Sequence, residues 1–217
     1  FARDSEFVFI EQSSSVLEFE LTANEESLKI YPFHFSLRIR YELKANKVEI
    51  TYTVFNSGGE ESFFSIGAHP GFNCKRLLGE TLNDFYLEFE NTKELVAEKL
   101  KDGLLSGDNS TMNLEGNKLP LNVKLFDNDA LVFRNTQIKQ VKLCSLKSKI
   151  QIVLDCKDWP YFGIWTKKGS DAFVCLEPWF GITDSVCASN DISHKEGIQS
   201  LKPYCSFVSS FSIEIED

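Results

Sequence analysis

The chain has 217 residues, of which 42% are hydrophobic and 19 are phenylalanine, so it can bury a sizeable core and is too apolar to stay disordered. Its formal net charge of −9 argues against a nucleic-acid partner, and no apolar run approaches the roughly 20 residues that span a bilayer. We therefore expect one soluble, cytoplasmic domain over residues 1–217, with no nucleic-acid or membrane partner.

The six cysteines are scattered and include no C-x-x-C pair, which favours reduced thiols over a disulfide framework. The chain has only three histidines and no H-x-x-x-H motif, so the spacing of its residues offers little to a metal ion. We expect no metal site and no cofactor.

Apolar and polar residues alternate with a period of two in much of the N-terminal third, which predicts β-strands. The last two of these segments flank a short polar break at 45–46 and predict a long hairpin. The predicted strands are 6–10, 16–21, 35–43 and 48–54. A turn at 56–59 then precedes an apolar run over 63–66.

The rest of the chain holds further short alternations, and only the segment near 93–100 favours a helix. Residues 101–118 are rich in Gly, Asn, Asp and Ser and indicate a loop. The predicted strands are 85–89, 130–133, 150–154, 161–165 and 211–215. Many short strands separated by such turns predict an all-β fold, a large antiparallel β-sandwich.

Two stretches place a titratable residue among small and aromatic residues at a strand-like run. They are Ser65–Cys74, with sequence SIGAHPGFNC, and Phe173–Gly181, with sequence FVCLEPWFG. We predict that the fold brings His69 and Glu177 to opposite sides of one sugar-sized cleft. The alternative is that the histidine is a structural residue and the glutamate caps a turn.

An imidazole with a pKa near 6.5 and a carboxylate beside a hydroxyl group form an acid/base pair. Such a pair can open a pyranose ring, since one group removes the proton of the anomeric hydroxyl while the other protonates the ring oxygen. Rotation about the freed carbon and reclosure then give the other anomer, without a metal or a redox cofactor.

Several motifs in order along the chain resemble the aldose 1-epimerase (galactose mutarotase-like) family, and most closely its mutarotase-related branch. They are FAR at 1–3, YPF at 31–33, the hairpin end at Asn56, IGAHPGFN at 66–73, LFDNDAL at 125–131 and CLEPW at 175–179. The resemblance runs over essentially the whole chain and implies the family's β-supersandwich, with a sugar lying across a concave sheet.

By position, the resemblance implies that His69 is the general acid at the ring oxygen and Glu177 the base at the anomeric hydroxyl. It also implies sugar contacts from Arg3 and Asp129, for which a surface residue and a turn residue are the alternatives. Further candidates for substrate binding are Asn73, Phe72 and Trp179. Packing in the core is the alternative for the two aromatic residues, and we expect His34 and His194 to be surface or packing residues.

Family members usually carry a His-Gly before the FAR motif and further strands upstream, so we expect N-terminal strands to be missing here. The resemblance favours an isomerase that interconverts the anomers of a hexose such as galactose or glucose, as a monomer or homodimer. Lys75 and Arg76 raise a hexose-6-phosphate 1-epimerase as an alternative, although a phosphate site prefers arginines, of which the chain has few. The third hypothesis is a non-catalytic carbohydrate-binding or regulatory protein on the same fold.

Overall fold

A computed structural model describes residues 1–134 and 137–217, and it is nearly all β. Contacts divide the chain into two compact units, residues 1–64 with 199–213 and residues 65–198 with 214–217. The predicted all-β class with large antiparallel sheets is confirmed. The single domain over 1–217 stays a prediction. Among the described residues, no helix has the length and apolarity to cross a bilayer.

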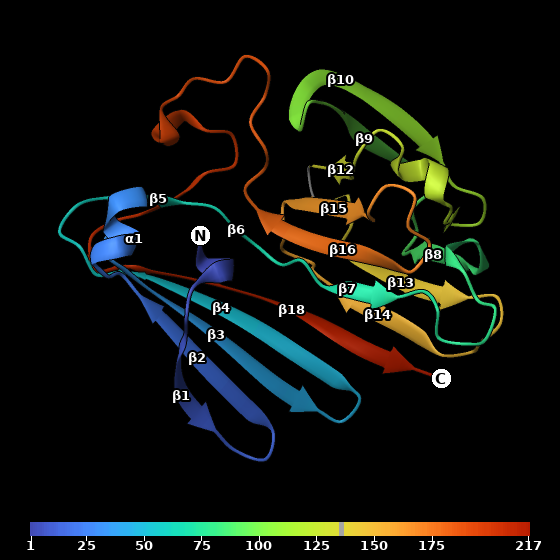
Figure 1. Cartoon of the computed structure of the whole chain (residues 1–217), viewed down its shortest axis with the longest axis horizontal. Coiled ribbons are helices and arrows are strands. Elements are labelled where there is room, and N and C mark those ends of the chain that lie inside the picture. Colours follow the sequence, from blue (N-terminus) through green and yellow to red (C-terminus); the bar gives the residue numbers. More distant parts are fainter. Residues whose placement is uncertain (135–136) are drawn as a thin grey trace. The chain divides into compact units, whose positions relative to one another are not determined.

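The first unit is built on neighbouring strands that follow the order of the chain, apart from the last one (Figure 1). They are β1 (Val8–Gln12), β2 (Val16–Thr22), β3 (Phe35–Lys44), β4 (Lys47–Asn56) and β18 (Ser206–Glu216). The predicted hairpin is confirmed, since β3 and β4 pair along their whole length. The 3-10 helix η1 (Ala2–Asp4) precedes β1, and a short pair of strands is formed by β5 (Ser62–Phe64) and β17 (Gln199–Leu201).

The helix α1 (Glu25–Ile30) of this unit begins at a capping box. The side chain of Asn24 accepts a hydrogen bond from the backbone of Ser27, and the Ser27 hydroxyl accepts one from the backbone of Asn24. These bonds satisfy backbone N–H groups at the start of the helix.

Four neighbouring strands of the second unit pair in the order β11-β8-β13-β14, all antiparallel. They are β11 (Lys118–Pro120), β8 (Phe85–Phe89), β13 (Gln140–Ser145) and β14 (Gln151–Asp155). Each of these strands contributes side chains to the core, among them the fully buried Leu87, Leu143 and Leu154. In β8 the buried positions alternate with half-buried ones, as the period-two pattern of the sequence predicts.

The other sheet of this unit has the order β10-β9-β12-β15-β16, and β6 and β7 pair with the remaining edge of β16 (Figure 1). Its strands are β10 (Leu104–Asn113), β9 (Glu94–Lys101), β12 (Leu131–Phe133), β15 (Tyr161–Trp165), β16 (Phe173–Phe180), β6 (Ile66–Gly67) and β7 (Gly71–Asn73). Short 3-10 helices lie between strands of the unit, namely η2 (Leu82–Asp84), η3 (Val123–Phe126) and η4 (Ile192–His194).

Two predictions about the middle of the chain are wrong. The helix near 93–100 is the strand β9, because its side chains alternate between buried and exposed positions and its backbone pairs with β10 and β12. The loop over 101–118 contains the strand β10, which lies at the edge of its sheet and is mostly exposed. An edge strand without a buried face needs no apolar alternation, so the sequence gives no sign of it.

Candidate active site

The site is built on β16, whose side chains alternate between the core and an open face. Val174 and Leu176 are completely buried on one side of the strand. Cys175, Glu177 and Trp179 therefore share the opposite face, because successive side chains of a strand point to opposite sides. The CLEPW motif thus places a thiol, a carboxyl group and an indole in a row.

His69 lies where the pairing with β16 is interrupted. Gly67 of β6 pairs with Trp179, and Gly71 of β7 pairs with Cys175. The three residues between these glycines bridge the gap, held by a hydrogen bond from the Ala68 N–H to the Pro178 carbonyl and another from the Leu176 N–H to the Pro70 carbonyl. His69 is two residues from each glycine, and Glu177 is two residues from both Trp179 and Cys175. His69 therefore lies opposite Glu177.

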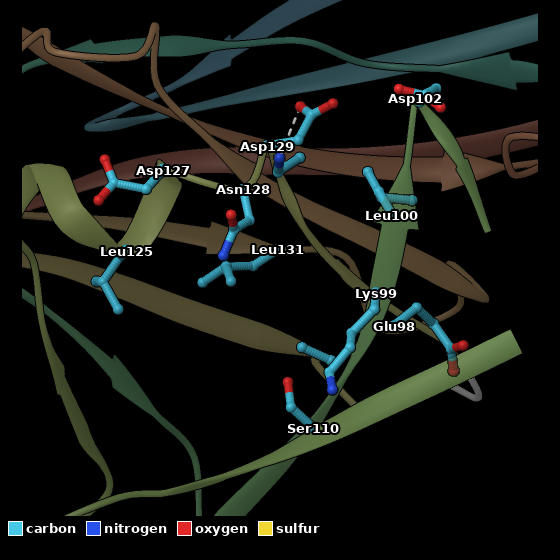
Figure 2. A pocket seen from close by; sticks show the side chains of 13 residues that line it. Glu98, Lys99, Leu100, Asp102, Ser110, Leu125, Asp127, Asn128, Asp129 and Leu131 are labelled. Carbon is cyan, nitrogen blue, oxygen red and sulfur yellow. Dashed lines mark hydrogen bonds between the residues drawn. The ribbon is translucent and has the colours of Figure 1, made fainter. Parts of the chain in front are cut away.

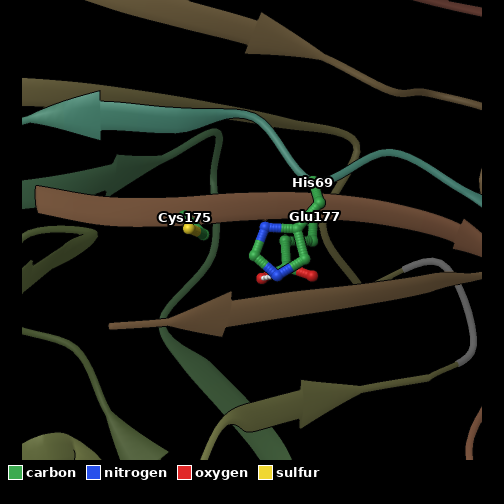
Figure 3. A group of neighbouring side chains, drawn as sticks. All are labelled: His69, Cys175 and Glu177. Atoms are coloured by element: carbon green, nitrogen blue, oxygen red, sulfur yellow. Dashed lines mark ion pairs between the residues drawn. The ribbon is translucent and has the colours of Figure 1, made fainter. Parts of the chain in front are cut away.

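The imidazole and the carboxylate of this pair are in direct contact (Figure 3). His69 Nε2 lies 3.2 Å from Glu177 Oε1. The imidazole side chain is 61% exposed, whereas that of the glutamate is 5% exposed. The edge of the imidazole also meets the ring of Trp165, with 5.8 Å between centroids. The structure therefore brings the two predicted groups together, but as neighbours and not on opposite sides of a cleft.

Burial changes the acidity of the carboxyl group. Removal from water disfavours the charged form and raises the pKa of Glu177 to about 7. A hydrogen bond from the Trp179 side chain acts in the opposite direction. The indole N–H is the donor, since it is the only one that a tryptophan side chain has. A carboxyl group with this pKa can accept and return a proton near neutral pH.

Two glycines leave the space that the indole ring of Trp179 occupies. A Cβ atom on Gly163 would lie 2.3 Å from Trp179 Cζ2, and one on Gly67 would lie 2.5 Å from Trp179 Cδ1. Gly163 and Gly67 belong to the strands on either side of β16. The ring thus lies across both neighbouring strands, in contact with backbone that has no side chain, and its N–H stays beside Glu177.

A cavity of about 530 Å³ opens at this face, within the size range of small-molecule sites. Three of the predicted site residues line it together, namely His69, Asp129 and Trp179. Its other lining side chains include the apolar residues Leu100, Ala130, Val132, Phe180 and Ile182. A sugar offers both hydroxyl groups and C–H faces, and a cavity of mixed polarity matches both.

Asp129 lies on an exposed turn with a φ of 83° and accepts a hydrogen bond from the next N–H. It borders a second hollow of about 530 Å³ that shares Leu100, Gly103 and Ala130 with the first. Figure 2 shows the side chains of Asp127, Asn128 and Asp129 leaving this turn in different directions. Asp129 is therefore both a turn residue and a cavity residue, so the two alternatives raised for it are compatible.

The buried Glu177 and the other predicted binding residues do not line this cavity. Phe72 is 8% exposed and pairs with Val174, so it faces the core, in agreement with the packing alternative. The side chain of Asn73 accepts a hydrogen bond from the Lys75 N–H and closes a local turn. Arg3 belongs to the first unit, where its guanidinium pairs with Asp4 at 3.0 Å.

Two residues of the site were not predicted as functional. Trp165 contacts the His69 ring, and Cys175 lies beside Glu177 on the open face of β16. Burial raises the pKa of the Cys175 thiol to about 12, so the thiol is neutral. The alternation over 161–165 predicts a strand, but only the pairing of Trp165 with Cys175 reveals that it borders the site.

Two sequence comparisons match nearly the whole chain. The sequence model of the aldose 1-epimerase family matches residues 1–213. The chromosomal LacX protein of Lactococcus lactis is 31% identical over 219 residues, which cover 99% of this chain and 73% of LacX.

Two solved structures also match over the full length of this chain. The galactose mutarotase related enzyme of Lactobacillus acidophilus matches with a TM-score of 0.93 and 34% identity, over 100% of this chain and 73% of that protein. A galactose mutarotase-like protein of Lactobacillus casei matches with a TM-score of 0.89 and 29% identity, over 100% and 75%. The predicted galactose mutarotase-like fold class is confirmed.

Proposed function

Because this chain belongs to the aldose 1-epimerase family, we propose that it is an isomerase that interconverts the α and β anomers of a free hexose. The observation that carries the proposal is the contact of 3.2 Å between the buried Glu177 and His69, which lines a cavity of suitable size. An acid and a base in contact at the wall of a cavity are what ring opening requires.

In the proposed reaction, ionised Glu177 removes the proton of the anomeric hydroxyl while protonated His69 donates a proton to the ring oxygen. The bond between the anomeric carbon and the ring oxygen breaks, and a carbonyl group forms. The two reacting oxygens are bonded to the same carbon, so neighbouring catalytic groups can reach both from one side. After rotation about the freed carbon, the reverse proton transfers close the ring as the other anomer.

Residues around the pair have distinct proposed roles in binding. Asp129 would accept hydrogen bonds from sugar hydroxyls, and Trp179 would pack against a C–H face of the ring. Both line the same cavity as His69. The role of Arg3 rests on the resemblance to the family.

Lys75 and Arg76, which suggested a phosphorylated substrate, contact other residues of the protein. Lys75 pairs with Asp171 at 2.7 Å, and the Arg76 guanidinium lies over the Phe85 ring at 4.7 Å. Among the described residues that line the cavity, the lysine or arginine is Lys195, which pairs with Asp184 at 2.6 Å. This arrangement favours an unphosphorylated sugar over a hexose 6-phosphate.

Polarimetry of freshly dissolved α-glucose, α-galactose and glucose 6-phosphate tests the proposal. We expect the protein to accelerate mutarotation of a free hexose more strongly than that of the phosphorylated sugar. A strong preference for glucose 6-phosphate would instead support the phosphate hypothesis. Calorimetric binding of a sugar without any acceleration would show a carbohydrate-binding protein.

A further inference from the structure

The open face of β16 gathers three different metal-binding side chains. The ligand atoms of His69, Cys175 and Glu177 all lie within 4.8 Å of one another. Figure 3 shows the three side chains on the same side of the β16 ribbon, with the imidazole reaching over from the segment between β6 and β7. His69 is far from Cys175 and Glu177 in the sequence, so residue spacing gives no sign of this cluster.

The strand geometry holds the cluster together. Cys175 and Glu177 are two positions apart on one strand and therefore share a face. His69 is fixed opposite Glu177 by the backbone bonds on either side of it. Gly71 pairs with Cys175 and has no side chain, and a Cβ atom there would lie 3.5 Å from the thiol sulfur. The glycine thus brings no side chain between β7 and the sulfur.

An imidazole nitrogen, a thiolate sulfur and a carboxylate oxygen are the donors that Zn²⁺ and its softer analogue Cd²⁺ accept. Bonds of about 2.0 to 2.3 Å place the ligand atoms of one tetrahedral zinc site about 3.5 Å apart. The separations here are at most 4.8 Å, so they need to shrink by about 1.3 Å or less to reach that spacing. The imidazole is 61% exposed, so it can move, and a fourth ligand can approach from solvent.

We propose that His69, Cys175 and Glu177 form a binding site for Zn²⁺ or Cd²⁺, and that the ion inhibits the enzyme. Binding forms a bond between the metal and the sulfur and releases the thiol proton to solvent, so no oxidant or reductant takes part. The ion occupies the lone pairs of the acid and the base that ring opening requires. The inhibition rests on the proposed function, whereas the binding site does not.

The experiment uses Cd²⁺, because a bond between cadmium and a thiolate gives a charge-transfer absorption in the ultraviolet. Cys187 and Cys205 are exposed and would add a background signal, so both are replaced by alanine in every variant. Into this background we introduce Cys175→Ala, and separately Cys175→Ser in case the first variant does not fold. Cys74→Ala, which removes another buried thiol, is the matched control.

We expect the background protein and the Cys74→Ala control to bind one Cd²⁺ per chain, with the absorption and with loss of mutarotation that EDTA reverses. Removal of the Cys175 thiol should abolish the absorption and weaken inhibition by at least about tenfold, the scale of losing part of a metal site. Inhibition is expressed relative to the metal-free rate of each variant, so a change in the basal rate does not affect the comparison.

Absence of the absorption in the background protein, or its persistence when Cys175 is replaced, would overturn the binding site. Absorption without inhibition would support the binding site and contradict the proposal that the ion inhibits the enzyme. The absorption is measured without substrate, so a protein that fails to accelerate mutarotation contradicts the proposed function and still decides the metal site.

Discussion

At the scale of single residues, the hydrogen bond from Trp179 tunes the acidity of Glu177. This bond lowers the carboxyl pKa and partly offsets the rise caused by burial. Trp179→Phe keeps an aromatic ring above the two glycines but removes the N–H donor, so the Glu177 pKa should rise further. The base works only when ionised, and the acidic limb of the profile of kcat/KM against pH should therefore move to higher pH.

The matched control is Trp165→Phe. Trp165 contacts the His69 ring, and Glu177 is acidified by Trp179 and not by Trp165. This variant should leave the acidic limb in place. A limb that stays fixed in Trp179→Phe, or that moves to lower pH, would show that the indole N–H does not stabilise the ionised carboxylate.

At the scale of the strand, the contact between Trp179 and its neighbours predicts the effect of adding one methyl group. In Gly163→Ala the new Cβ would lie 2.3 Å from the indole, so the ring must move and Glu177 loses its donor. We expect a destabilisation of about 1 to 3 kcal/mol, typical of overpacking. We also expect slower mutarotation, measured by polarimetry, with stability measured by urea unfolding.

Gly59→Ala is the control for this change, because the nearest atom to its new Cβ would be the Tyr204 hydroxyl at 3.9 Å. It should leave both the rate and the free energy of unfolding close to wild type. Wild-type rate and stability in Gly163→Ala would mean that the glycine is not needed to position the indole.

The strands that the sequence predicts well are those with one buried face. The alternation over 85–89 gives β8, and the alternation over 35–43 and 48–54 gives the hairpin of β3 and β4, since burial imposes a period of two. The segment 93–100 has helix-favouring residues, yet pairing with two neighbouring strands outweighs that propensity.

The sequence singles out the candidate acid/base pair, but it predicts neither the geometry of the pair nor the neighbouring Trp165 and Cys175. His69 and Glu177 stand out as titratable residues among small and aromatic ones, and the resemblance to the family adds Asp129. Their contact depends on the gap between β6 and β7, which is set by pairing with a strand about a hundred residues away. The positions of Phe72 in the core and of Gly163 under the indole depend on the same pairing.

At the scale of the whole molecule, burial of Glu177 links stability to pH. Its pKa is about 7 in the folded protein and near 4.5 when solvated. Below the lower value both states are protonated, and the group imposes no cost. Between these values the unfolded chain ionises while the folded protein does not, so the free energy of unfolding falls by up to about 3 kcal/mol as pH rises.

Glu177→Gln removes this titrating group. The free energy of unfolding of the variant should therefore not show the part of the fall with rising pH that Glu177 causes. Urea unfolding of the wild type and the variant at about pH 4.5 and about pH 8 measures the effect, because the difference between the two proteins cancels the other titrating groups. The variant should gain stability relative to wild type at the higher pH. An equal difference at both pH values would contradict the raised pKa.

The distribution of thiols provides a further test of the fold. Cys74, Cys144, Cys156 and Cys175 are buried, and burial raises the pKa of each, whereas Cys187 and Cys205 are exposed. Thiolates are the reactive form. Ellman's reagent should therefore titrate two thiols per chain in the native protein and six after denaturation. Fewer than six after denaturation without reductant would reveal a disulfide, and rapid reaction of more than two in the native protein would contradict this burial.

The acid/base role of the His69 and Glu177 pair is tested most directly by the polarimetric rate of mutarotation in two variants. His69→Asn and Glu177→Gln should each slow the protein-dependent rate on its preferred hexose by about 100-fold or more, the scale of losing a general acid or base. His34→Asn, which replaces an exposed histidine of the other unit, should keep the wild-type rate. A wild-type rate in His69→Asn or in Glu177→Gln would contradict the account.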